Sequence, residues 1–592
     1  MKIKKREWAV KQLEDAASND IWKFQDWSKG IRNYPTPPIS RGANAPKAIT
    51  HQEKCDALRN ELYQPPPALP TEFLPNLSDL QDHDMPFIPI TESEIEEAIA
   101  NASSKSAAGF SQISYKAIKL TWTAPEGKLY INKLIQKCAE SGYHPRAWRR
   151  AVAIALRKPG KPDYSNPRAY RLITLLECLG KVLEKVVARR LTFLAGKHDL
   201  VPSNQFGGRS HSSTSDALIS FVNDVHAAWN HGRVTSALTF DIKGYFDFVN
   251  HKRLLSVLRE KGIPLPLVKW VASFLDERQA AVCLDGIRGD MSHVENGIPQ
   301  GSPVSPILAA YYTSDLFNLF RQNPTLSTPI PDKPTPVTLF MYVDDGKLTV
   351  SSRSLETNIA LLQSAYNKVD TWLHQAGLSP DYAKRELMHY TRRKKDGSPS
   401  IMFDDRDGVR RVITPESHVR WLGVHFDRKL LFSHHVKLAA AKGTNAVCSL
   451  SMLANTVRGL HQKQLRHLYI SCVLPKILYA APVWASGKAN QLKPLVKVQR
   501  RALIQMCAAF RTTSTEALEI EASLPPLHLQ IKQLKTQYAI RFNRLPSSSP
   551  VLQRLGNDWR KGKKPKFPPP SPTETLQQLR SGQQPFHPTN GP

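Results

Sequence analysis

The sequence predicts an α+β protein in which a mixed region is followed by an all-helical one. From Thr91 to about residue 430, helical and strand patterns alternate without a long-period repeat. Thr91 and Glu94 form a capping box that opens the first helix of this region. Residues 434–480 place apolar side chains at helical spacing and contain almost no strand signal. A chain of 592 residues is also too long for one ordinary domain.

Four regions are expected along the chain. Residues 1–89 combine short helical patches with Pro-rich breaks, which is typical of a partly ordered arm. The mixed region covers residues 90–430, and the helical region covers residues 431–530. Residues 531–592 are rich in Ser, Pro and Lys, so they are predicted to form a disordered tail.

The composition points to a polyanionic partner. Lys and Arg together number 81 against 51 Asp and Glu, which gives a formal net charge of +30. Nucleic acid is the interpretation we favour, with an anionic membrane surface or a basic, ribosome-like binding protein as alternatives. The seven cysteines have no zinc-type spacing, so we expect buried thiols in a reducing compartment. The sequence contains no run of 18 apolar residues, so we expect no membrane-spanning helix.

The strongest local signal is the segment VTLFMYVDDGKLTV (337–350). Two β-rich runs flank a polar Asp-Asp-Gly turn, which predicts a hairpin. A tight turn alone would explain the pattern, but Asp344 and Asp345 side by side at a strand end favour a cation site. Asp241 ends a second strand pattern in VTSALTFDIKGYFDFV. Three carboxylates on adjacent strand ends would suit Mg²⁺, and a metal pair can stabilise the oxygens of a phosphoryl transfer.

A Gly/Pro-rich loop lies between these two strand patterns in the sequence. In NGIPQGSPVSPILAAYYTSDLF (296–317) the first part reads as a loop and the apolar run after it as a helix. A loop that feeds a helix start would let a nucleotide approach the backbone at Gly301. An ordinary Pro/Gly turn is the alternative interpretation.

Taken in order, these segments resemble the palm of reverse transcriptases, and they are most similar to those of non-LTR (LINE-type) retrotransposons. The resemblance covers roughly residues 90–525. It implies a right-hand polymerase with fingers and an antiparallel-sheet palm in the mixed region (catalytic core about 140–427) and a helical thumb after it. The further motifs are RKPGK (157–161), YRLITLLECLGKVLEK (170–185), NQFGGRSHSSTSDAL (204–218), GLSPDYAKRELMHY (377–390), WLGVHFD (421–427), YAAPVW (479–484) and VQRRALIQMCAAFRTTSTEAL (498–518).

The resemblance assigns catalytic roles to four residues. Asp241 and Asp344 would be the main metal ligands, and Asp345 would be the third carboxylate. Together they would hold two Mg²⁺ ions, with Mn²⁺ as an alternative metal. Lys384 is the candidate general acid towards pyrophosphate, and a surface lysine without a role is its alternative.

The resemblance also implies a nucleotide pocket. Phe246 stands at the steric-gate position, where a large ring blocks the 2′-OH of an incoming ribonucleotide. The other residues that would contact the nucleotide are Gln300 and Gly301 in the pocket and Lys158 and Arg171 at the triphosphate. The implied partners are an RNA template, a DNA primer and dNTPs, and the implied location is the nucleus, after assembly with RNA in the cytoplasm.

Some positions depart from the pattern of the family. Tyr245 stands where Ala is usual, Leu172 where Pro is usual, and Phe110 and Ser111 replace a Pro/Asp pair. The segments before the fingers motifs and after the thumb motifs are too short for an endonuclease and an RNase H domain. We therefore expect a fragment that lacks both domains.

Two alternatives to an active retrotransposon polymerase follow from the sequence. One is a catalytically dead remnant that binds nucleic acid, against which the five intact residues Asp241, Phe246, Gln300, Asp344 and Asp345 argue. The other is a group II intron maturase, which the segments FRTTSTEAL and YAAPVW fit less well.

Overall fold

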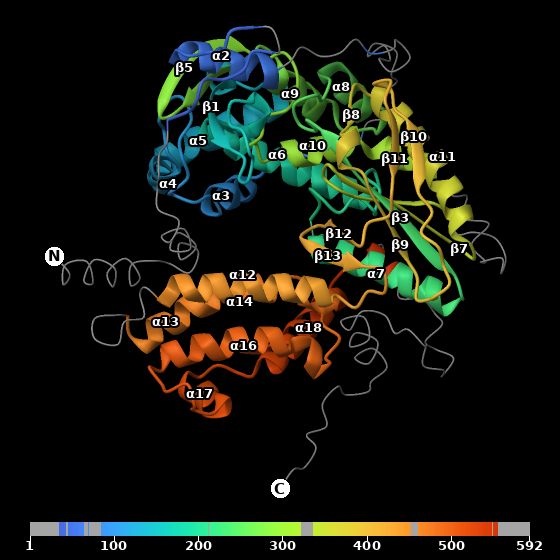
Figure 1. Ribbon diagram of the computed structural model, residues 1–592. Helices are drawn as coiled ribbons and strands as arrows, with labels where there is room; N and C mark the ends of the chain where they lie inside the picture. Colours follow the sequence, from blue (N-terminus) through green and yellow to red (C-terminus); the bar gives the residue numbers. More distant parts are fainter. Residues whose placement is uncertain are drawn as a thin grey trace.

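The structure is a computed structural model that describes residues 35–42, 45–63, 69, 85–210, 212–320, 336–451, 460–546 and 549–554. In this part of the chain, a mixed body of helices and strands is joined to a smaller body made of helices (Figure 1). The predicted α+β class and the order of its two parts are confirmed. None of the described helices has the length and apolar character that a membrane span requires.

A five-stranded sheet in the mixed body carries the predicted strand ends. Its order is β6-β7-β3-β8, and β9 also pairs with β3. These pairings are all antiparallel. The strands are β3 (Val234–Lys243), β6 (Thr338–Tyr342), β7 (Asp345–Ser352), β8 (Ser379–Pro380) and β9 (Glu386–Tyr390).

Helices pack on both faces of this sheet. Helix α11 (Leu355–Gln375) contacts β3 and β7, and α7 (Thr214–Asn230) contacts β3, β6 and β7. Alternate side chains of a strand point to opposite faces, so Leu339 belongs to the core that includes α11 whereas Phe340 belongs to the core that includes α7. Residues 234–240 of β3 are therefore buried at every position, because helices cover both faces of the sheet.

A second, four-stranded sheet has the order β2-β1-β4-β5. Helix α2 (His51–Leu62), from the predicted arm, packs on β4 and β5 and buries Cys55 and Leu58 there. This part of the arm is ordered, while residues 1–34 lie outside the described ranges. The strands are β1 (Arg150–Arg157), β2 (Tyr170–Leu175), β4 (Gln279–Leu284) and β5 (Ile287–His293).

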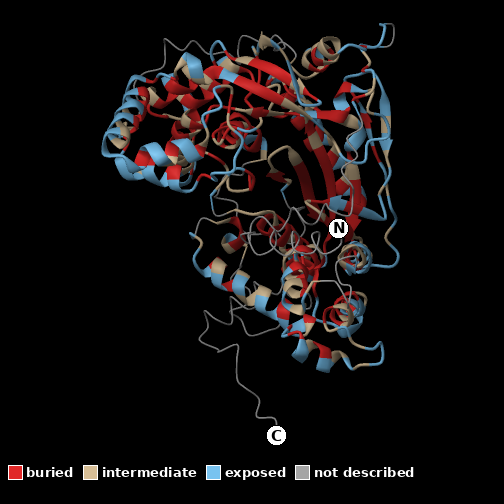
Figure 2. Ribbon diagram, turned by 90° about the vertical axis from the view of Figure 1, so that its left-hand side faces the viewer, coloured by how far each residue is buried: buried red, intermediate tan, exposed pale blue. Residues whose placement is uncertain are grey.

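Further helices surround the two sheets, and two small hairpins follow them. The capping box of Thr91 and Glu94 is confirmed at the start of α3. Buried residues follow the strands and the inner helix faces (Figure 2). The remaining elements are α3 (Glu92–Ala100), α4 (Tyr115–Thr123), α5 (Pro125–Ser141), α6 (Cys178–Lys197), α8 (His251–Glu260), α9 (Leu265–Leu275), α10 (Ser305–Tyr312), β10 (Ile401–Asp404), β11 (Arg410–Ile413), β12 (His418–Trp421) and β13 (Val424–Asp427).

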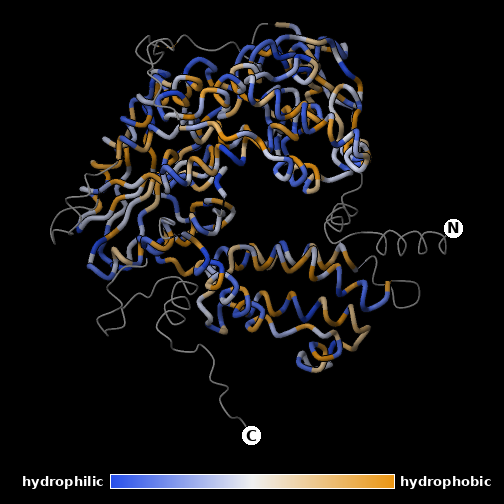
Figure 3. Tube along the Cα trace, turned by 180° about the vertical axis from the view of Figure 1, so that it is seen from behind, coloured by the Kyte–Doolittle hydropathy of each residue, from blue (hydrophilic) through white to orange (hydrophobic). Residues whose placement is uncertain are grey.

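The helical body confirms the helical prediction for residues 434–480 wherever they are described. Hydrophobic and hydrophilic residues alternate along its long helices, which pack through their apolar faces (Figure 3). Tyr469–Val473 forms a π-helical turn between α13 and α14. The helices are α12 (Ser433–Ser451), α13 (Gln462–Leu468), α14 (Leu474–Ile477), α15 (Ala481–Trp484), α16 (Ala489–Met506), α17 (Thr515–Glu521), α18 (Leu527–Asn543) and α19 (Pro550–Gln553).

The predicted start of the disordered tail at residue 531 is wrong, because α18 continues through it. Arg541 of α18 donates two hydrogen bonds, of 2.7 and 2.6 Å, to the buried carboxylate of Asp216 in α7. Arg554 bonds Asp224 of α7 at 2.9 Å. These ion pairs hold the C-terminal helices against the mixed body. The prediction rested on composition, which contains no information about such tertiary contacts. The rest of the predicted tail lies outside the described residues.

Lys347 of β7 is fully buried among aromatic rings. Its Nζ lies 3.8 Å from the ring centroid of Phe221, 4.2 Å from that of Trp421 and 4.8 Å from that of Phe426. No hydrogen-bond partner reaches Nζ among the described residues. The rings favour an ammonium by about 0.5–2 kcal/mol each, and the charge of Glu386 also favours it, but burial of the ion without a hydrogen-bonded partner costs more. Burial therefore dominates and holds the pKa of Lys347 well below its usual range.

Lys347→Met tests whether the buried amine destabilises the fold. At neutral pH the unfolded chain keeps the lysine protonated while the folded chain disfavours the ammonium, so stability should rise with pH up to the ordinary lysine pKa of about 10.4. We expect Lys347→Met to raise the free energy of unfolding by about 1–3 kcal/mol at neutral pH. The gain should shrink as the pH approaches 10. Urea unfolding of both proteins across this pH range measures it, and a less stable Met variant at every pH would mean that the rings stabilise a charged lysine.

Candidate active site

The register of β3 against β7 brings the predicted carboxylates together. Asp241 lies directly opposite Asp345 in this antiparallel pair. Asp344 lies in the turn between β6 and β7, and its carbonyl accepts a hydrogen bond of 3.2 Å from the N–H of Ile242. Asp241 and the two adjacent residues Asp344 and Asp345, which are far from Asp241 in the sequence, therefore meet at one end of the sheet.

The hairpin turn is shifted from its predicted position. We expected Asp344, Asp345 and Gly346 to form it, but Tyr342 already pairs with Asp345. The turn consists of Val343 and Asp344, so Asp345 and Gly346 belong to β7. Val343 has a φ of 62°, in the left-handed region that β-branched residues rarely adopt. Backbone strain of this kind persists only where the surrounding structure enforces it.

The motif NQFGGRSHSSTSDAL (204–218) holds Val343 in this conformation. Gln205 accepts a hydrogen bond of 3.4 Å from the N–H of Val343 on its Oε1. The N–H of Phe206 donates to the carbonyl of Met341 at 2.8 Å. A Cβ on Gly207 would lie only 2.4 Å from the Val343 nitrogen, so a side chain at 207 would displace the turn. The motif therefore acts here by holding the carboxylate-bearing turn.

The three carboxylates lie close together, and the positive charges near them do not offset the effects of burial and mutual repulsion. Burial and the charge of Asp241 raise the pKa of Asp344 above its usual range. Burial and the charges of Asp344 and Asp241 raise the pKa of Asp345 to about 6. Like charges at such spacing disfavour each other's ionised forms. A bound cation would relieve this repulsion.

Lys384 lies at this cluster of carboxylates. Its Nζ is 2.5 Å from Oδ2 of Asp241 and 3.1 Å from Oδ2 of Asp381. Burial would lower the pKa of Lys384, but the hydrogen bonds to these two carboxylates and their charges outweigh burial and raise it. The residue predicted as a general acid is therefore protonated and within reach of the site, while its role stays a prediction.

The carboxylates are not a preformed metal shell. Within the described ranges, no three Asp, Glu, His or Cys side chains converge as a ready set of ligands. The donor set still suits Mg²⁺, which takes one or two protein carboxylates and completes its shell with water and phosphate oxygens. A divalent ion at Asp241 would compete with the ammonium of Lys384.

A cleft of about 920 Å³ opens beside the carboxylates. Asp345 is not part of its wall, whereas Asp241 and Asp344 are. All five predicted nucleotide-binding residues line the cleft, together with Lys384: Lys158, Arg171, Phe246, Gln300 and Gly301. The structure thus gathers residues from both sheets and from the loop before α10 around one space.

Gly301 has a structural requirement in addition to its predicted role beside the nucleotide, which stays a prediction. A Cβ there would lie 2.5 Å from the carbonyl oxygen of Thr174 in β2. Its φ is also +131°, which favours glycine. The Thr174 N–H donates to the carbonyl of Gln300 at 2.7 Å, so the loop is pinned to β2.

Asp247 is a site residue that the sequence prediction missed. The Nε2 of Gln300 donates to its Oδ1 at 3.1 Å. Burial raises the pKa of Asp247 to about 6, against the opposing effects of Gln300 and two cationic neighbours, Lys158 and Arg171. In the sequence, the one signal that could have predicted Asp247 as a site residue was its position directly after Phe246. Asp247 orients the side chain of Gln300 in the cleft.

The cationic end of the cleft also contains residues that were not predicted. The Nζ of Lys158 donates to the carbonyl of Arg168 at 2.9 Å. Burial and the charge of Arg171 lower the pKa of Lys158. Arg168 forms an ion pair of 2.5 Å with Glu61 of α2, so the arm reaches the wall of the cleft. Clustered cations of this kind suit a polyphosphate.

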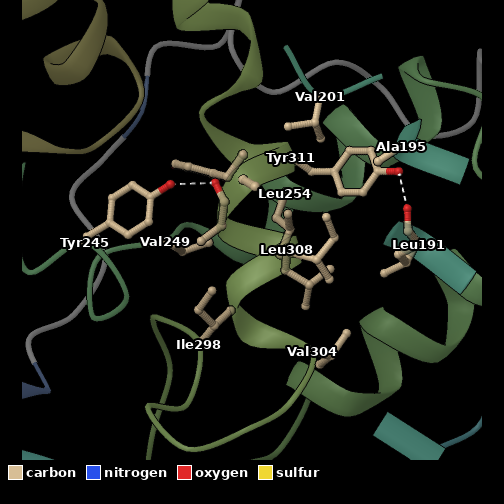
Figure 4. Close-up of a cluster of buried hydrophobic side chains, with 14 of the residues drawn as sticks. Leu191, Ala195, Val201, Tyr245, Val249, Leu254, Ile298, Val304, Leu308 and Tyr311 are labelled. Carbon is tan, nitrogen blue, oxygen red and sulfur yellow. Dashed lines mark hydrogen bonds between the residues drawn. The ribbon is translucent and has the colours of Figure 1, made fainter. Parts of the chain in front are cut away.

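Two of the four departures from the family pattern, Tyr245 and Ser111, have structural explanations. Tyr245, where Ala is usual, is buried and donates its O–H to the carbonyl of Ala309 at 2.9 Å (Figure 4). It packs edge-on behind Phe246, with ring centroids 5.5 Å apart. Ser111, where Asp is usual, donates its N–H to the carboxylate of Glu177 at 2.8 Å, where a second carboxylate would be repelled.

A buried antiparallel sheet with carboxylates at its strand ends, beside a cationic cleft, is suited to an enzyme that transfers phosphoryl groups. Residues 156–426 match the family described as reverse transcriptase (RNA-dependent DNA polymerase). Residues 156–426 therefore form a reverse transcriptase domain, and relatives of the chain are named as RNA-directed DNA polymerases of mobile elements.

Three relatives from Drosophila melanogaster illustrate the similarity. The probable RNA-directed DNA polymerase from transposon BS is 26% identical over 80% of this chain and 51% of its own length. The RNA-directed DNA polymerase from mobile element jockey is 26% identical over 92% of this chain and 58% of its own. The probable RNA-directed DNA polymerase from transposon X-element is 24% identical over 90% and 57%. The chain thus spans about half the length of these curated relatives.

Lys384→Met tests the competition between the ammonium and a divalent ion. Without the ammonium, Asp241 is free to bind a metal. Because this ion pair is partly exposed and screened by solvent, the gain should be modest, about two- to fivefold in Mn²⁺ affinity. Electron paramagnetic resonance of Mn²⁺ without nucleotide measures it. Lys161→Met, which changes a cleft lysine outside this pair, is the control, and equal affinities for wild type and Lys384→Met would contradict the competition.

Proposed function

We propose that the chain is an RNA-directed DNA polymerase that extends a DNA primer on an RNA template. The observation that carries the proposal is the meeting of Asp241 and Asp344 with all five predicted nucleotide-binding residues around one cleft. The net charge of +30 supports a polyanionic partner. The substrates would be the RNA template, the DNA primer and dNTPs.

We infer a right-hand arrangement from the two sheets and the helical body. The five-stranded sheet would be the palm, the β2-β1-β4-β5 sheet with its helices the fingers, and the helices from α12 onward the thumb. An RNA–DNA hybrid between them would be A-form. The protein would therefore hold it through the backbone and the wide minor groove rather than through base edges.

The chemistry would be divided between a metal pair and the chain's own residues. Asp241, Asp344 and Asp345 would hold two Mg²⁺ or Mn²⁺ ions. These ions would neutralise the negative charge that develops in phosphoryl transfer. Lys384, which carries a proton in this structure, would donate it to the pyrophosphate leaving group. Lys158 and Arg171 would orient the triphosphate, and Phe246 would exclude a 2′-OH.

Primer extension tests the proposal. The purified chain should extend oligo(dT) on poly(rA) with dTTP and Mg²⁺. The rival is a dead remnant, which would bind the same primer–template without extending it. Binding without extension, for a chain that unfolds cooperatively, would overturn the proposed activity.

Asp344→Asn tests the assignment of the carboxylates. The amide keeps the shape of the side chain but removes a negative charge from the site. Loss of several kcal/mol of charge stabilisation corresponds to at least about a 1000-fold fall in the rate of extension. The melting temperature should not fall, because removing one of three crowded carboxylates relieves repulsion. Extension near the wild-type rate would show that the metals bind elsewhere.

Phe246→Val tests the steric gate. The smaller side chain leaves room for a 2′-OH, so incorporation of UTP relative to dTTP should increase by about 10-fold or more. A 10-fold increase corresponds to the loss of a steric penalty of about 1.4 kcal/mol against the ribonucleotide. Extension with dTTP should fall only modestly. Tyr245→Phe, which keeps the ring behind the gate, is the matched control. If Phe246→Val left discrimination unchanged, the gate would lie at another residue.

A further inference from the structure

Lys384 lies on a short turn that other elements hold on two sides. The turn is the 3-10 helical segment Tyr382–Lys384, which follows β8. The N–H of Asp381 donates to the carbonyl of Asp241 in β3 at 2.8 Å. The first side of the turn is therefore bonded to the strand that carries a candidate metal ligand. The second side is held by Arg385, the residue directly after Lys384.

Arg385 is fully buried and joins the turn to a separate hairpin. Its side chain is 0% exposed and that of Asp405, its partner, is 2% exposed. Its Nη1 donates to Oδ1 of Asp405 at 2.8 Å, and its Nη2 donates to Oδ2. Its Nε donates to the carbonyl of Tyr382 at 3.2 Å. One guanidinium thus ties the first residue of the turn to Asp405, which directly follows β10.

The hairpin that supplies Asp405 is itself fixed in the mixed body. The β10–β11 hairpin lies beside α11 (Figure 1), and Arg406 donates to Asp370 of that helix at 2.8 Å. Three rings surround the guanidinium of Arg385, with the centroids of Phe403, Tyr366 and Tyr382 at 4.7, 5.0 and 5.2 Å from its central carbon. The hydrophobic core therefore sets where this guanidinium lies.

The same network continues to the wall of the cleft. Nη1 of Arg411 in β11 donates to Oδ2 of Asp405 at 2.7 Å. Arg411 also donates to both carboxylate oxygens of Asp407, at 2.8 and 2.7 Å. Arg411 and Asp407 line the 920 Å³ cleft, as Lys384 does. A continuous set of ion pairs therefore runs from the buried Arg385 to the space in which the nucleotide would lie.

A buried ion pair at this place needs an explanation other than stability. An apolar pair of similar volume is often as stable as a buried ion pair, because removing two charges from water is costly. Apolar side chains could fill the space of Arg385 and Asp405, but they could not bond to the carbonyl of Tyr382. The directional bonds of the guanidinium are therefore what the ion pair adds. They matter at a reacting group, where a displacement of about 1 Å can lower a rate by about 100-fold.

We propose that the buried pair of Arg385 and Asp405 positions Lys384, because it fixes the turn that carries this lysine between β3 and the β10–β11 hairpin. Neither residue of the pair contacts substrate, so both are positioning residues. The inference rests on the proposed function for the role of Lys384 as the proton donor to pyrophosphate. Without the pair, the turn keeps its bond to β3 but loses its second support, and the ammonium no longer stays at Asp241.

The test replaces the pair by apolar side chains. Arg385→Met/Asp405→Leu, which we call the apolar variant, should fold, since such replacements of buried ion pairs are often neutral or stabilising. Arg411 keeps its bonds to Asp407 in this variant. Arg410→Met is the matched control, because Arg410 is an exposed arginine of the same hairpin that pairs with the exposed Asp404.

Single-turnover extension of oligo(dT) on poly(rA) gives the first readout. A positioned general acid contributes about 100- to 10,000-fold to a rate, so the apolar variant should lose about 10-fold or more at saturating dTTP. Its Kd for dTTP should stay within about twofold of wild type, because a proton donor acts in the transition state. Arg410→Met should match wild type in both quantities.

A double-mutant cycle with Lys384→Met separates positioning from a general structural effect. In the Lys384→Met background the apolar variant should change the rate by less than about twofold, since residues that act through one group are not additive. Equal losses in both backgrounds would overturn the proposal. If the apolar variant unfolds at a lower temperature, Arg385→Lys replaces it and should give the same cycle, because an ammonium cannot reproduce the fork of the guanidinium.

Mn²⁺ affinity without nucleotide gives a readout that does not depend on activity. Release of Lys384 from Asp241 should raise this affinity in the apolar variant by about two- to fivefold, as in Lys384→Met, with no further rise when the changes are combined. A wild-type affinity in the apolar variant, when Lys384→Met alone raises it, would overturn the proposal. A chain that never extends a primer would overturn the proposed polymerase activity, and the Mn²⁺ cycle would still decide whether the pair positions Lys384.

Discussion

The antiparallel register of β3 with β7 is the constraint on which the rest of the structure depends. It sets Asp241 opposite Asp345 and leaves Asp344 at the turn. Because alternate side chains of these strands enter separate cores against α7 and α11, a shift of one residue would exchange the two faces of the sheet. The positions of the carboxylates are therefore as firmly fixed as the hydrophobic core itself.

The site concentrates negative charge at its centre and positive charge around it. Burial and the charge of Asp241 raise the pKa of Asp344, and burial and the charges of Asp344 and Asp241 raise that of Asp345. Lys384, which pairs with Asp241, opposes both shifts without cancelling them. Lys158 and Arg171 add positive charge on the cleft wall. A polyanion would meet favourable charge around the carboxylates, which agrees with the large net charge of the chain, and it would need bound cations at the carboxylates themselves.

The sequence predicted those features that local patterns encode. Apolar runs ending in Asp predicted the strand ends, helical spacing predicted the helical body, and the motifs predicted which residues would meet in the cleft. It did not predict the turn at Val343, because the Asp-Gly pair is a stronger local turn signal than a valine that only the contacts of Gln205 and Gly207 hold in place. The burial of Lys347, the ion pair of Arg541 with Asp216 and the bond between Gln300 and Asp247 depend on tertiary contacts that no local pattern reveals.

The central claim is that the carboxylates at the β3 and β7 strand ends form the metal-dependent polymerisation site. Anomalous diffraction from the chain bound to an RNA–DNA duplex, a non-hydrolysable dNTP and Mn²⁺ tests it most directly. We expect Mn²⁺ peaks at Asp241 and Asp344, the triphosphate near Lys158 and Arg171, and Lys384 no longer paired with Asp241. A bound nucleotide with no metal at these carboxylates, and with the Lys384–Asp241 pair intact, would contradict it.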